Sequence, residues 1–522
     1  MDVDKIKKAI LCRHCYEFRI SRAEAVCSIP DCDCSKEKSF ETIVEWYALL
    51  YKMLDNLNYI DYKTASNRDP EEAHKVYHKL EREWASHLRP HQVLYTTRSY
   101  ITVDSGTKDF YRELILSSKS LNNLLLRMVS LLQVLDRQLL KIKTDYNLYY
   151  KEELPIETRY GDLVPVGDSV LLLAIQGHPS YRRPIDPNYL LLSNNVQSFH
   201  LAKPSYTFYQ VKHRHLNTPT YTPENVLDLK IGFLPGKFDV SFDYQLHTDS
   251  ELDDDGLRPF YFKGVSDPQR YYSHVMGLFE QLLEHKPDMM MLPELFTPPD
   301  LREQLVQRLR ESASASDKLG EDRRPFLFLS GSFHENIDDH IFNAAQITSG
   351  NGKELSKVYK MNRFILQRSE DFKGELAPFV HHDGVEKNAY DRREITLFES
   401  SLGRIAIFIC IDFLSSQLEE VLLDRKVDVI LVMAMTPNPA SGKFTRRMQE
   451  LAERNGAVVI VCNHFGKPEA DTSKVDKEAR VVVSLPGFKQ VYWDPMESGV
   501  CTIRQVIENL TAKKQARSGF SG

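Results

Sequence analysis

The amino-acid sequence predicts an α/β fold for the C-terminal half of the chain, preceded by a mainly helical region with a cysteine-rich start. Beyond residue 225, short apolar runs alternate with amphipathic stretches, as in layered domains of strands and helices. Residues 41–150 carry helical patterns, and five of the eight cysteines fall between residues 12 and 34. We therefore divide the chain into residues 1–40, 41–150, 151–224, 225–510 and a flexible tail at 511–522.

Length and charge limit the classes of protein to consider. A chain of 522 residues is too long for one ordinary domain, and a formal net charge of −6 gives no global reason to bind nucleic acid or an anionic membrane. The start lacks the apolar core of a secretory signal, and the best apolar runs, "SVLLLAIQG" and "IAIFICI", are too short to span a bilayer. We expect a cytoplasmic protein.

The cysteines near the N-terminus are spaced like the ligands of a structural zinc ion. In a reducing compartment, thiols crowded in this way indicate a metal before a disulfide. The stretch "CRHCYEFRISRAEAVCSIPDCDC" offers two pairs that would surround one tetrahedral ion and leave no open position for catalysis. The alternative is a run of unpaired thiols. We predict the ligands Cys12, Cys15, Cys27 and Cys32, with Cys34 or His14 as substitutes.

A long helix is predicted from about residue 109 to residue 145. Its apolar residues recur in steps of four and three, which keeps one seam of the helix facing a partner. The seam consists of Leu121, Leu125, Met128, Leu132, Leu135, Leu139 and Ile142. Because the repeat lasts only about three heptads, we favour packing within its own domain over an intermolecular coiled coil.

Residues 151–224 are predicted to form an irregular subdomain or connector. The only clear buried strand there lies in "GDSVLLLAIQG". The stretch "PSYTFYQVKHRHLNTPTYTPEN" mixes aromatic with basic residues, which would suit single-stranded nucleic acid, although prolines and a polar loop explain it at least as well. A protein or nucleic-acid partner of the N-terminal half stays open.

Within the α/β region, the stretch "GRIAIFICIDF" places Cys410 at the end of an apolar strand. Ser416 and Glu419 form a capping pattern, which predicts that a helix begins just beyond the cysteine. A thiol facing a helix N-terminus gains thiolate character from the helix dipole. Taken alone, however, a cysteine on an apolar strand is more often an inert core residue.

Two further residues supply the partners that a reactive thiol needs. The apolar strand in "PDMMMLPELFTPPD" ends at Glu294, and a carboxylate there is costly to bury without a partner or a task. The stretch "GKELSKVYKMNRF" offers lysines, of which Lys360 is the best candidate. A base, a thiol and a cation together perform acyl chemistry on a carbonyl or nitrile carbon.

The order and flanks of these residues resemble the three catalytic blocks of the nitrilase (carbon–nitrogen hydrolase) superfamily. The blocks are "MLPELF", "HIFNAAQITSGNGKELSKVYKMNRF" and "GRIAIFICIDF", and the resemblance covers about residues 226–507. It implies Glu294 as general base, Lys360 as oxyanion stabiliser and Cys410 as nucleophile. A second glutamate often follows the lysine in this family, and Glu370 in "ILQRSEDFKG" lies in a comparable place.

The resemblance also implies a fold and an assembly. The family fold is an α-β-β-α sandwich, commonly paired into homo-oligomers through helices near the active site, and its chemistry requires no metal or organic cofactor. Two departures are visible in this sequence. The context "VYKMNRF" only approximates the usual lysine motif, which leaves Lys357 as an alternative, and Ile411 stands where an aromatic residue often follows the nucleophile.

The sequence therefore predicts a thiol-dependent hydrolase of nonpeptide carbon–nitrogen bonds, acting on a small amide or nitrile through an acyl-enzyme on Cys410. The alternative is a nitrilase-like scaffold or sensor module whose N-terminal half binds a protein or nucleic acid. By analogy with nitrilase-like domains that accompany reverse transcriptases, that second role would belong to antiviral defence.

Overall fold

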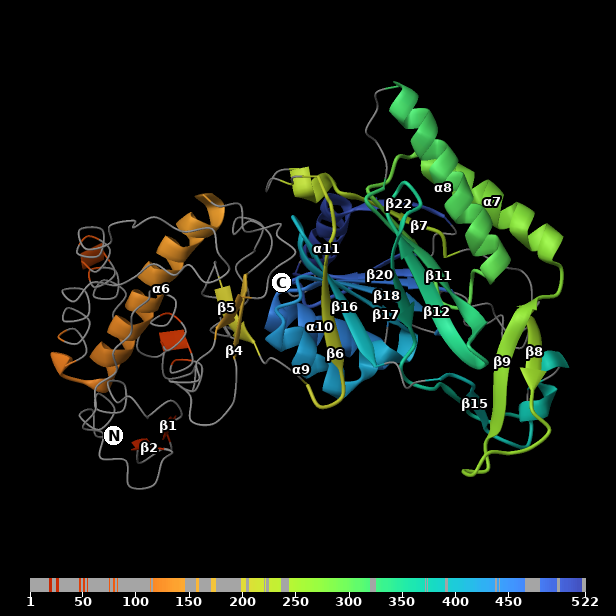
Figure 1. Cartoon of the computed structure of the whole chain (residues 1–522), viewed down its shortest axis with the longest axis horizontal. Helices are drawn as coiled ribbons and strands as arrows, with labels where there is room; N and C mark the ends of the chain where they lie inside the picture. The colour runs from red at the N-terminus through yellow and green to blue at the C-terminus, as the bar shows by residue number, and fades with distance from the viewer. Residues whose placement is uncertain are drawn as a thin grey trace. The chain divides into compact units, whose positions relative to one another are not determined.

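A computed structural model describes most of the C-terminal part of the chain and portions of the rest (Figure 1). The described residues are 18–20, 25–27, 116–145, 156–158, 170–174, 199–202, 206–219, 225–235, 244–319, 325–370, 374–389, 393–436, 442–464, 479–494 and 498–518, with positions 47, 50, 51, 54, 75, 78, 79, 82, 113, 221, 372, 439 and 440. The chain divides into two compact units. The first holds residues 1–175, 187–205 and 424–426, and the second holds 176–186, 206–423 and 427–522.

The first unit contains one long helix and two small antiparallel sheets among its described residues. Strand β1 (Phe18–Ile20) pairs with β2 (Ala25–Cys27). The other sheet consists of β3 (Ile156–Thr158), β4 (Val170–Ala174) and β5 (Phe199–Ala202). Strand β4 confirms the strand predicted in "GDSVLLLAIQG". Across the described part of the chain, no helix is long and apolar enough to cross a membrane.

Helix α6 (Leu121–Asp145) confirms the C-terminal part of the helix predicted from about residue 109, whereas residues 117–120 form a turn rather than helix. It also buries more than the predicted stripe. The four stripe residues with described side chains, Leu125, Met128, Leu132 and Leu135, are at most 2% exposed. Residues off the stripe are buried as well, namely Leu124, Leu126, Val129, Leu131, Val134 and Asp136. Since a helix that is apolar nearly all round belongs inside a protein, the middle of α6 forms the core of this unit.

The predicted zinc ligands lie almost wholly outside the described residues. Cys12, Cys15 and Cys32 are not described, nor are the substitutes Cys34 and His14, whereas Cys27 ends strand β2 opposite Phe18. Within the residues that the structure covers, no three histidine, cysteine, aspartate or glutamate side chains are grouped to hold a metal. The zinc site stays a prediction.

The second unit is built on two large sheets. The seven-stranded sheet has the order β21 (Tyr492–Asp494), β20 (Val481–Ser484), β19 (Val458–Asn463), β18 (Val429–Ala434), β17 (Gly403–Ile409), β16 (Glu394–Ser400), β6 (Gln210–His215). The six-stranded sheet has the order β13 (Glu354–Tyr359), β12 (His340–Thr348), β11 (Leu327–Ile337), β10 (Met289–Leu292), β7 (Lys230–Phe233), β22 (Gly499–Thr502). A smaller sheet joins β14 (Ile365–Leu366), β15 (Gly384–Glu386), β9 (Arg258–Val265) and β8 (Tyr244–Thr248).

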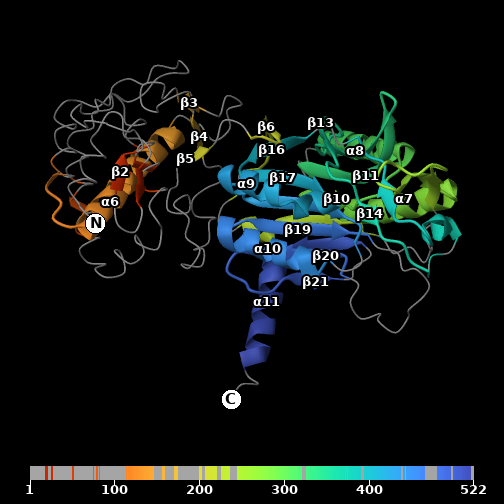
Figure 2. The same ribbon diagram turned by 90° about the horizontal axis from the view of Figure 1, so that it is seen from below.

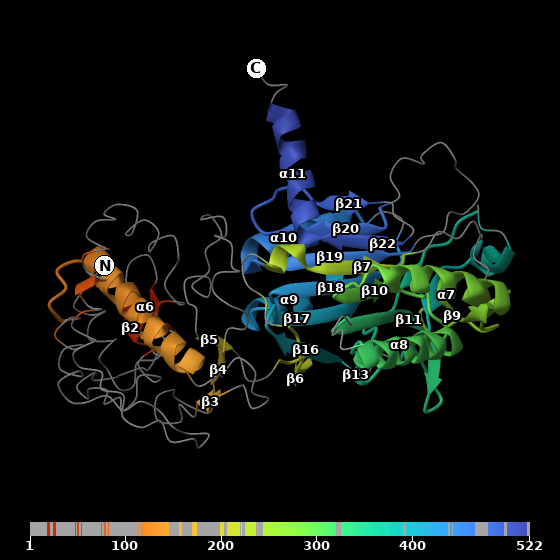
Figure 3. The same cartoon turned by 90° about the horizontal axis from the view of Figure 1, so that it is seen from above.

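Helices cover the outer faces of these two sheets. On the six-stranded sheet lie α7 (Pro268–Glu284) and α8 (Pro299–Leu319), side by side in Figures 1 and 3. Against the seven-stranded sheet pack α9 (Ser416–Asp424) and α10 (Gly442–Asn455). The described residues of the unit also form three short 3₁₀ helices, η5 (Asn225–Asp228), η6 (Gly374–Phe379) and η7 (Cys410–Leu414).

The alternation of side chains along β10 shows why the unit has four layers. Met289 and Met291 point into the core between the two sheets, whereas Met290 and Leu292 point into the core beneath α7 and α8. All four residues are at most 1% exposed, because successive side chains of a strand face opposite sides and both sides are covered. The predicted α-β-β-α sandwich is confirmed.

The second unit extends beyond both predicted boundaries of the α/β domain. Strand β6 pairs in parallel with β16, so the sheet includes residues 210–215 and the predicted start at residue 225 is too late. At the other end, helix α11 (Ile503–Ser518) continues through much of the segment expected to be a flexible tail. Figure 2 shows α11 projecting away from the sheets.

Candidate active site

Cys410 lies where the central strand β17 gives way to the 3₁₀ turn η7. Every residue of β17 is buried, and Cys410 itself is 6% exposed. Its φ of 47° is left-handed, a conformation that costs a non-glycine residue roughly 1–2 kcal/mol. Leu295, which follows Glu294, has a φ of 51°. Backbone strain therefore occurs next to both the predicted nucleophile and the predicted base.

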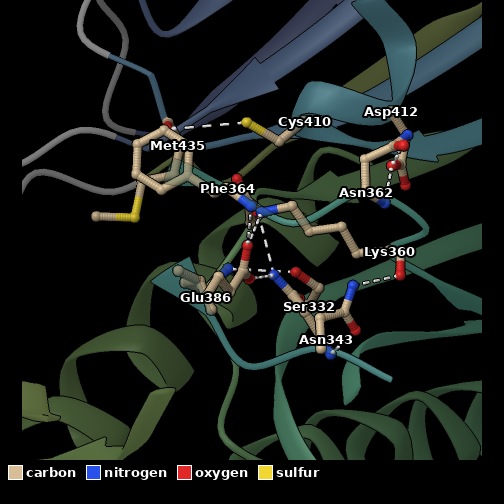
Figure 4. A network of polar contacts seen from close by, with 12 residues as sticks. Ser332, Asn343, Lys360, Asn362, Phe364, Glu386, Cys410, Asp412 and Met435 are labelled. Atoms are coloured by element: carbon tan, nitrogen blue, oxygen red, sulfur yellow. Dashed lines mark hydrogen bonds and ion pairs between the residues drawn. The ribbon is translucent and has the colours of Figure 1, made fainter. Parts of the chain in front are cut away.

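Lys360 lies between two buried carboxylates. Its Nζ donates to Oε1 of Glu294 at 2.8 Å and to Oε2 of Glu386 at 2.5 Å. Glu294 comes from the end of β10, Lys360 from the residue after β13 and Glu386 from the end of β15, and none is more than 3% exposed. Figure 4 shows the Lys360 side chain entering this group, with Cys410 above it and Glu386 and Asn343 below.

Opposite charges keep Lys360 and Glu386 ionised despite their burial. Burial alone would lower the pKa of Lys360, but the charges of Glu294 and Glu386 outweigh it and raise that pKa well above its usual value. Burial alone would raise the pKa of Glu386, whereas the charge of Lys360 and a hydrogen bond from His334 bring it down to about 2. Lys360 is therefore an ammonium and Glu386 a carboxylate at neutral pH.

Glu386 accepts four hydrogen bonds, and Asn343 joins it to Glu294. The Nδ2 of Asn343 donates to Glu294 at 3.1 Å and to Glu386 at 3.0 Å. The backbone N–H of Phe364 donates to Oε2 of Glu386 at 3.1 Å, and Nε2 of His334 lies 3.0 Å from Oε1. With Lys360 included, both oxygens of Glu386 are fully engaged. The two carboxylates thus have different surroundings, and Glu294 is the less saturated.

The thiol of Cys410 is neutral at rest, contrary to the thiolate character expected from a helix dipole. Burial, and then the charge of Glu294 within hydrogen-bonding reach, raise the pKa of the thiol well above its usual value, and Lys360 only partly offsets them. Helix α9 begins at Ser416, beyond the intervening turn η7, so its N-terminus is not directly behind the sulfur. The thiol lies 3.9 Å from the carbonyl oxygen of Met435.

Asp412, in the turn that begins at Cys410, is hydrogen-bonded to the two residues that follow Lys360. Its carboxylate accepts hydrogen bonds from the backbone N–H of Met361 at 2.8 Å, and from the backbone and side chain of Asn362 at 2.7 and 2.8 Å. The side chain is fully buried, and burial raises the pKa of Asp412 to about 7 against the lowering effect of these bonds. Lys360 and Cys410 are thereby held in register.

The structure does not bring two of the residues considered from the sequence into this cluster. Glu370 is exposed on a turn, and the position next to Lys360 belongs instead to Glu386, so the choice of Glu370 as the second glutamate is corrected. The alternative lysine, Lys357, lies on β13 and is paired with Glu335 at 3.7 Å. No local pattern marks Glu386, because it reaches the site through the pairing of the short strand β15 with β9.

Comparisons with known proteins give one family match and several similar solved structures. Residues 257–490 match the family model described as "Carbon-nitrogen hydrolase". No curated protein is significantly similar to the chain in sequence. Among solved structures, an amidase from Nesterenkonia sp. is 13% identical, with 54% of this chain and 94% of that chain covered and a TM-score of 0.31.

A cysteine-to-alanine variant of that amidase in complex with butyramide is 14% identical, with 54% of this chain and 95% of that chain covered and a TM-score of 0.31. The family match spans the strands that carry Glu294, Lys360 and Cys410. Residues 257–490 therefore form a carbon–nitrogen hydrolase domain, that is, a nitrilase-like domain.

Proposed function

We propose that this protein hydrolyses a nonpeptide carbon–nitrogen bond of a small amide or nitrile through an acyl-enzyme on Cys410. The observation that carries the proposal is the burial of the Cys410 thiol together with Glu294, whose carboxylate shares the ammonium group of Lys360 with Glu386. A buried thiol with a raised pKa is a poor nucleophile until a base removes its proton. This arrangement supports Glu294 as that base.

In the first half of the reaction, the sulfur of Cys410 attacks the carbonyl carbon of an amide while Glu294 takes the thiol proton. Negative charge develops on the carbonyl oxygen, and the ammonium group of Lys360 stabilises it. The carbon–nitrogen bond then breaks, and the leaving amine takes the proton from Glu294. These steps leave a thioester on Cys410 and release ammonia or an amine.

In the second half, Glu294 takes a proton from a water molecule as that water attacks the thioester. The carbon–sulfur bond breaks, the carboxylic acid leaves, and the proton on Glu294 returns to the sulfur. The two nitrogen donors to Glu294, Lys360 and Asn343, share Oε1, so Oε2 is the oxygen that takes a proton without losing either bond. Glu386 stays ionised throughout, because its four hydrogen bonds oppose protonation.

The experiment is a screen of short-chain amides and nitriles for release of ammonia, with Cys410→Ala as the inactive variant. The matched control is Cys462→Ala, since Cys462 is also buried on a strand of the same sheet and donates to the backbone carbonyl oxygen of Met291 at 3.4 Å. We expect hydrolysis by the wild type and the Cys462 variant alone. Equal hydrolysis by the Cys410 variant contradicts the mechanism, and no hydrolysis of any amide or nitrile contradicts the substrate class.

A further inference from the structure

A buried histidine connects the candidate active site to the backbone of another sheet. His334 lies on β11, and its side chain is 1% exposed. The ring nitrogen Nδ1 lies 3.2 Å from the backbone nitrogen of Phe262 on β9, and Nε2 lies 3.0 Å from Oε1 of Glu386. The ring of Phe262 packs beside it at a centroid distance of 5.9 Å. Both ring nitrogens are therefore in use.

These two contacts determine which nitrogen carries the proton. A backbone N–H only donates, so Nδ1 must accept from Phe262 and carries no proton. The ring proton is then on Nε2, where it points at the carboxylate of Glu386. Because the acceptor is part of the fixed backbone of β9, the tautomer is set by the fold rather than by the carboxylate.

We propose that His334 is a positioning residue, which fixes Glu386 and keeps it ionised through its Nε2–H, so that Lys360 stays shared between two carboxylates. This inference rests on the proposed function. If Glu386 took a proton, Lys360 would keep Glu294 as its sole anionic partner. The ammonium group of Lys360 would then stabilise the negative charge of Glu294 more strongly. Glu294 would be a weaker base, and proton transfer from Cys410 would be slower.

Among the groups around Glu386, His334 is the side-chain donor whose removal would change the hydrogen bonds of Glu386 and leave those of Glu294 in place. The ionisable groups that act on Glu386 are Lys360 and His334, while Glu294 and Cys410 act on Lys360 in turn. Lys360 and the amide of Asn343 are each shared with Glu294, and the N–H of Phe364 binds the other oxygen. His334 alone among the side-chain donors serves Glu386 without touching Glu294.

Two substitutions separate the donor from the shape of the ring. In His334→Gln, the side-chain amide nitrogen takes the place of Nε2 and donates to Glu386. In His334→Asn, the side-chain oxygen takes the place of Nδ1 and accepts from Phe262, but the donor to Glu386 is lost. The matched control is His381→Asn, because His381 is exposed. Melting temperatures of all three variants check that each is folded.

The first readout is steady-state kinetics on the best substrate from the screen. We expect His334→Asn to lower kcat roughly ten- to a hundred-fold with little change in KM, since the ring does not contact substrate and the loss is one of alignment. His334→Gln should recover most of the wild-type kcat, and His381→Asn should leave it unchanged. Equal losses in the Gln and Asn variants would mean that only packing matters, and no loss in His334→Asn would also overturn the inference.

The second readout does not depend on hydrolysis and so separates this inference from the proposed function. Carboxyl ¹³C NMR of labelled glutamate follows the titration of Glu386, with Glu386→Gln to assign the signal. We expect the midpoint to rise by roughly one to two pH units in His334→Asn, which is the effect of one charge-assisted hydrogen bond, and to stay at its wild-type value in His334→Gln. An unchanged midpoint in His334→Asn contradicts the positioning role even if the enzyme hydrolyses amides.

Discussion

Replacing Glu294 with glutamine should remove the base while keeping the contacts that hold the site together. Lys360 and Asn343 both donate to Oε1 of Glu294, and the amide oxygen of glutamine accepts the same two bonds. The substitution also removes the excess negative charge of two carboxylates around one ammonium group. We therefore expect little change in melting temperature, and any loss of activity then reports on proton transfer.

The size of the effect follows from the two tasks that Glu294 performs. Loss of a positioned general base costs about 100- to 10,000-fold in turnover. At the same time, the thiol loses an anionic neighbour. The pKa of the Cys410 thiol should therefore fall, because the negative charge that opposes its ionisation is gone. Burial and then the charge of Glu294 are what raise that pKa in the wild type.

The assay combines turnover with the pH dependence of alkylation by iodoacetamide, followed by intact mass. In Glu294→Gln, turnover should fall because acyl transfer has no base. Alkylation at a given pH should become faster because the thiol ionises more easily. The control is Glu370→Gln, since Glu370 is exposed and should leave both measurements unchanged. A Glu294→Gln variant with wild-type turnover, or with an unshifted alkylation profile, would refute the assignment of Glu294 as the base beside Cys410.

Three further predictions test other parts of the structure. Burial raises the pKa of Asp412 to about 7, so between about pH 4 and 7 the folded state keeps a proton that the unfolded state has lost. The free energy of unfolding should fall with rising pH by up to about 4 kcal/mol across that window, and denaturant titrations of Asp412→Asn should lack this component. Leu132→Lys should destabilise the protein by more than about 3 kcal/mol because Leu132 is 1% exposed, whereas Leu116→Lys, at a position 45% exposed, should leave the melting temperature unchanged. Elemental analysis of protein purified without added metal should find about one zinc per chain, and a zinc content near zero with freely titratable N-terminal thiols would exclude the site.

The sequence was sufficient to predict the residues that end buried strands. Cys410 and Glu294 each follow an apolar run whose strand character is plain, and the polar group at its end stands out for that reason. Lys360 directly follows β13, but this strand reads ELSKVY and is mostly half-buried, so no apolar run marks the lysine. Because these strands lie in neighbouring sheets of one four-layer fold, their ends meet, and the family resemblance gave the order in which to read them.

Glu386 and His334 were not predictable, because long-range pairing places them. Glu386 is 26 positions after Lys360 and ends a three-residue strand, which is too short to carry a pattern. His334 lies in strand β11 among other polar residues, and its partner is apparent only when β9 and β15 are placed beside β11. Strand β6 was missed for a related reason, since "QVKHRH" is polar and half-exposed and lacks the apolar run that reveals a buried strand.

The central claim is that Cys410 carries the acyl group, and intact-mass spectrometry of the protein mixed with a small primary amide tests it most directly. The acid-quenched wild type should gain the mass of the amide less ammonia, and peptide mapping should place the addition on Cys410. Cys410→Ala should gain nothing, while Cys462→Ala should behave as the wild type does. An adduct on another residue, or turnover that persists in Cys410→Ala, would contradict the account.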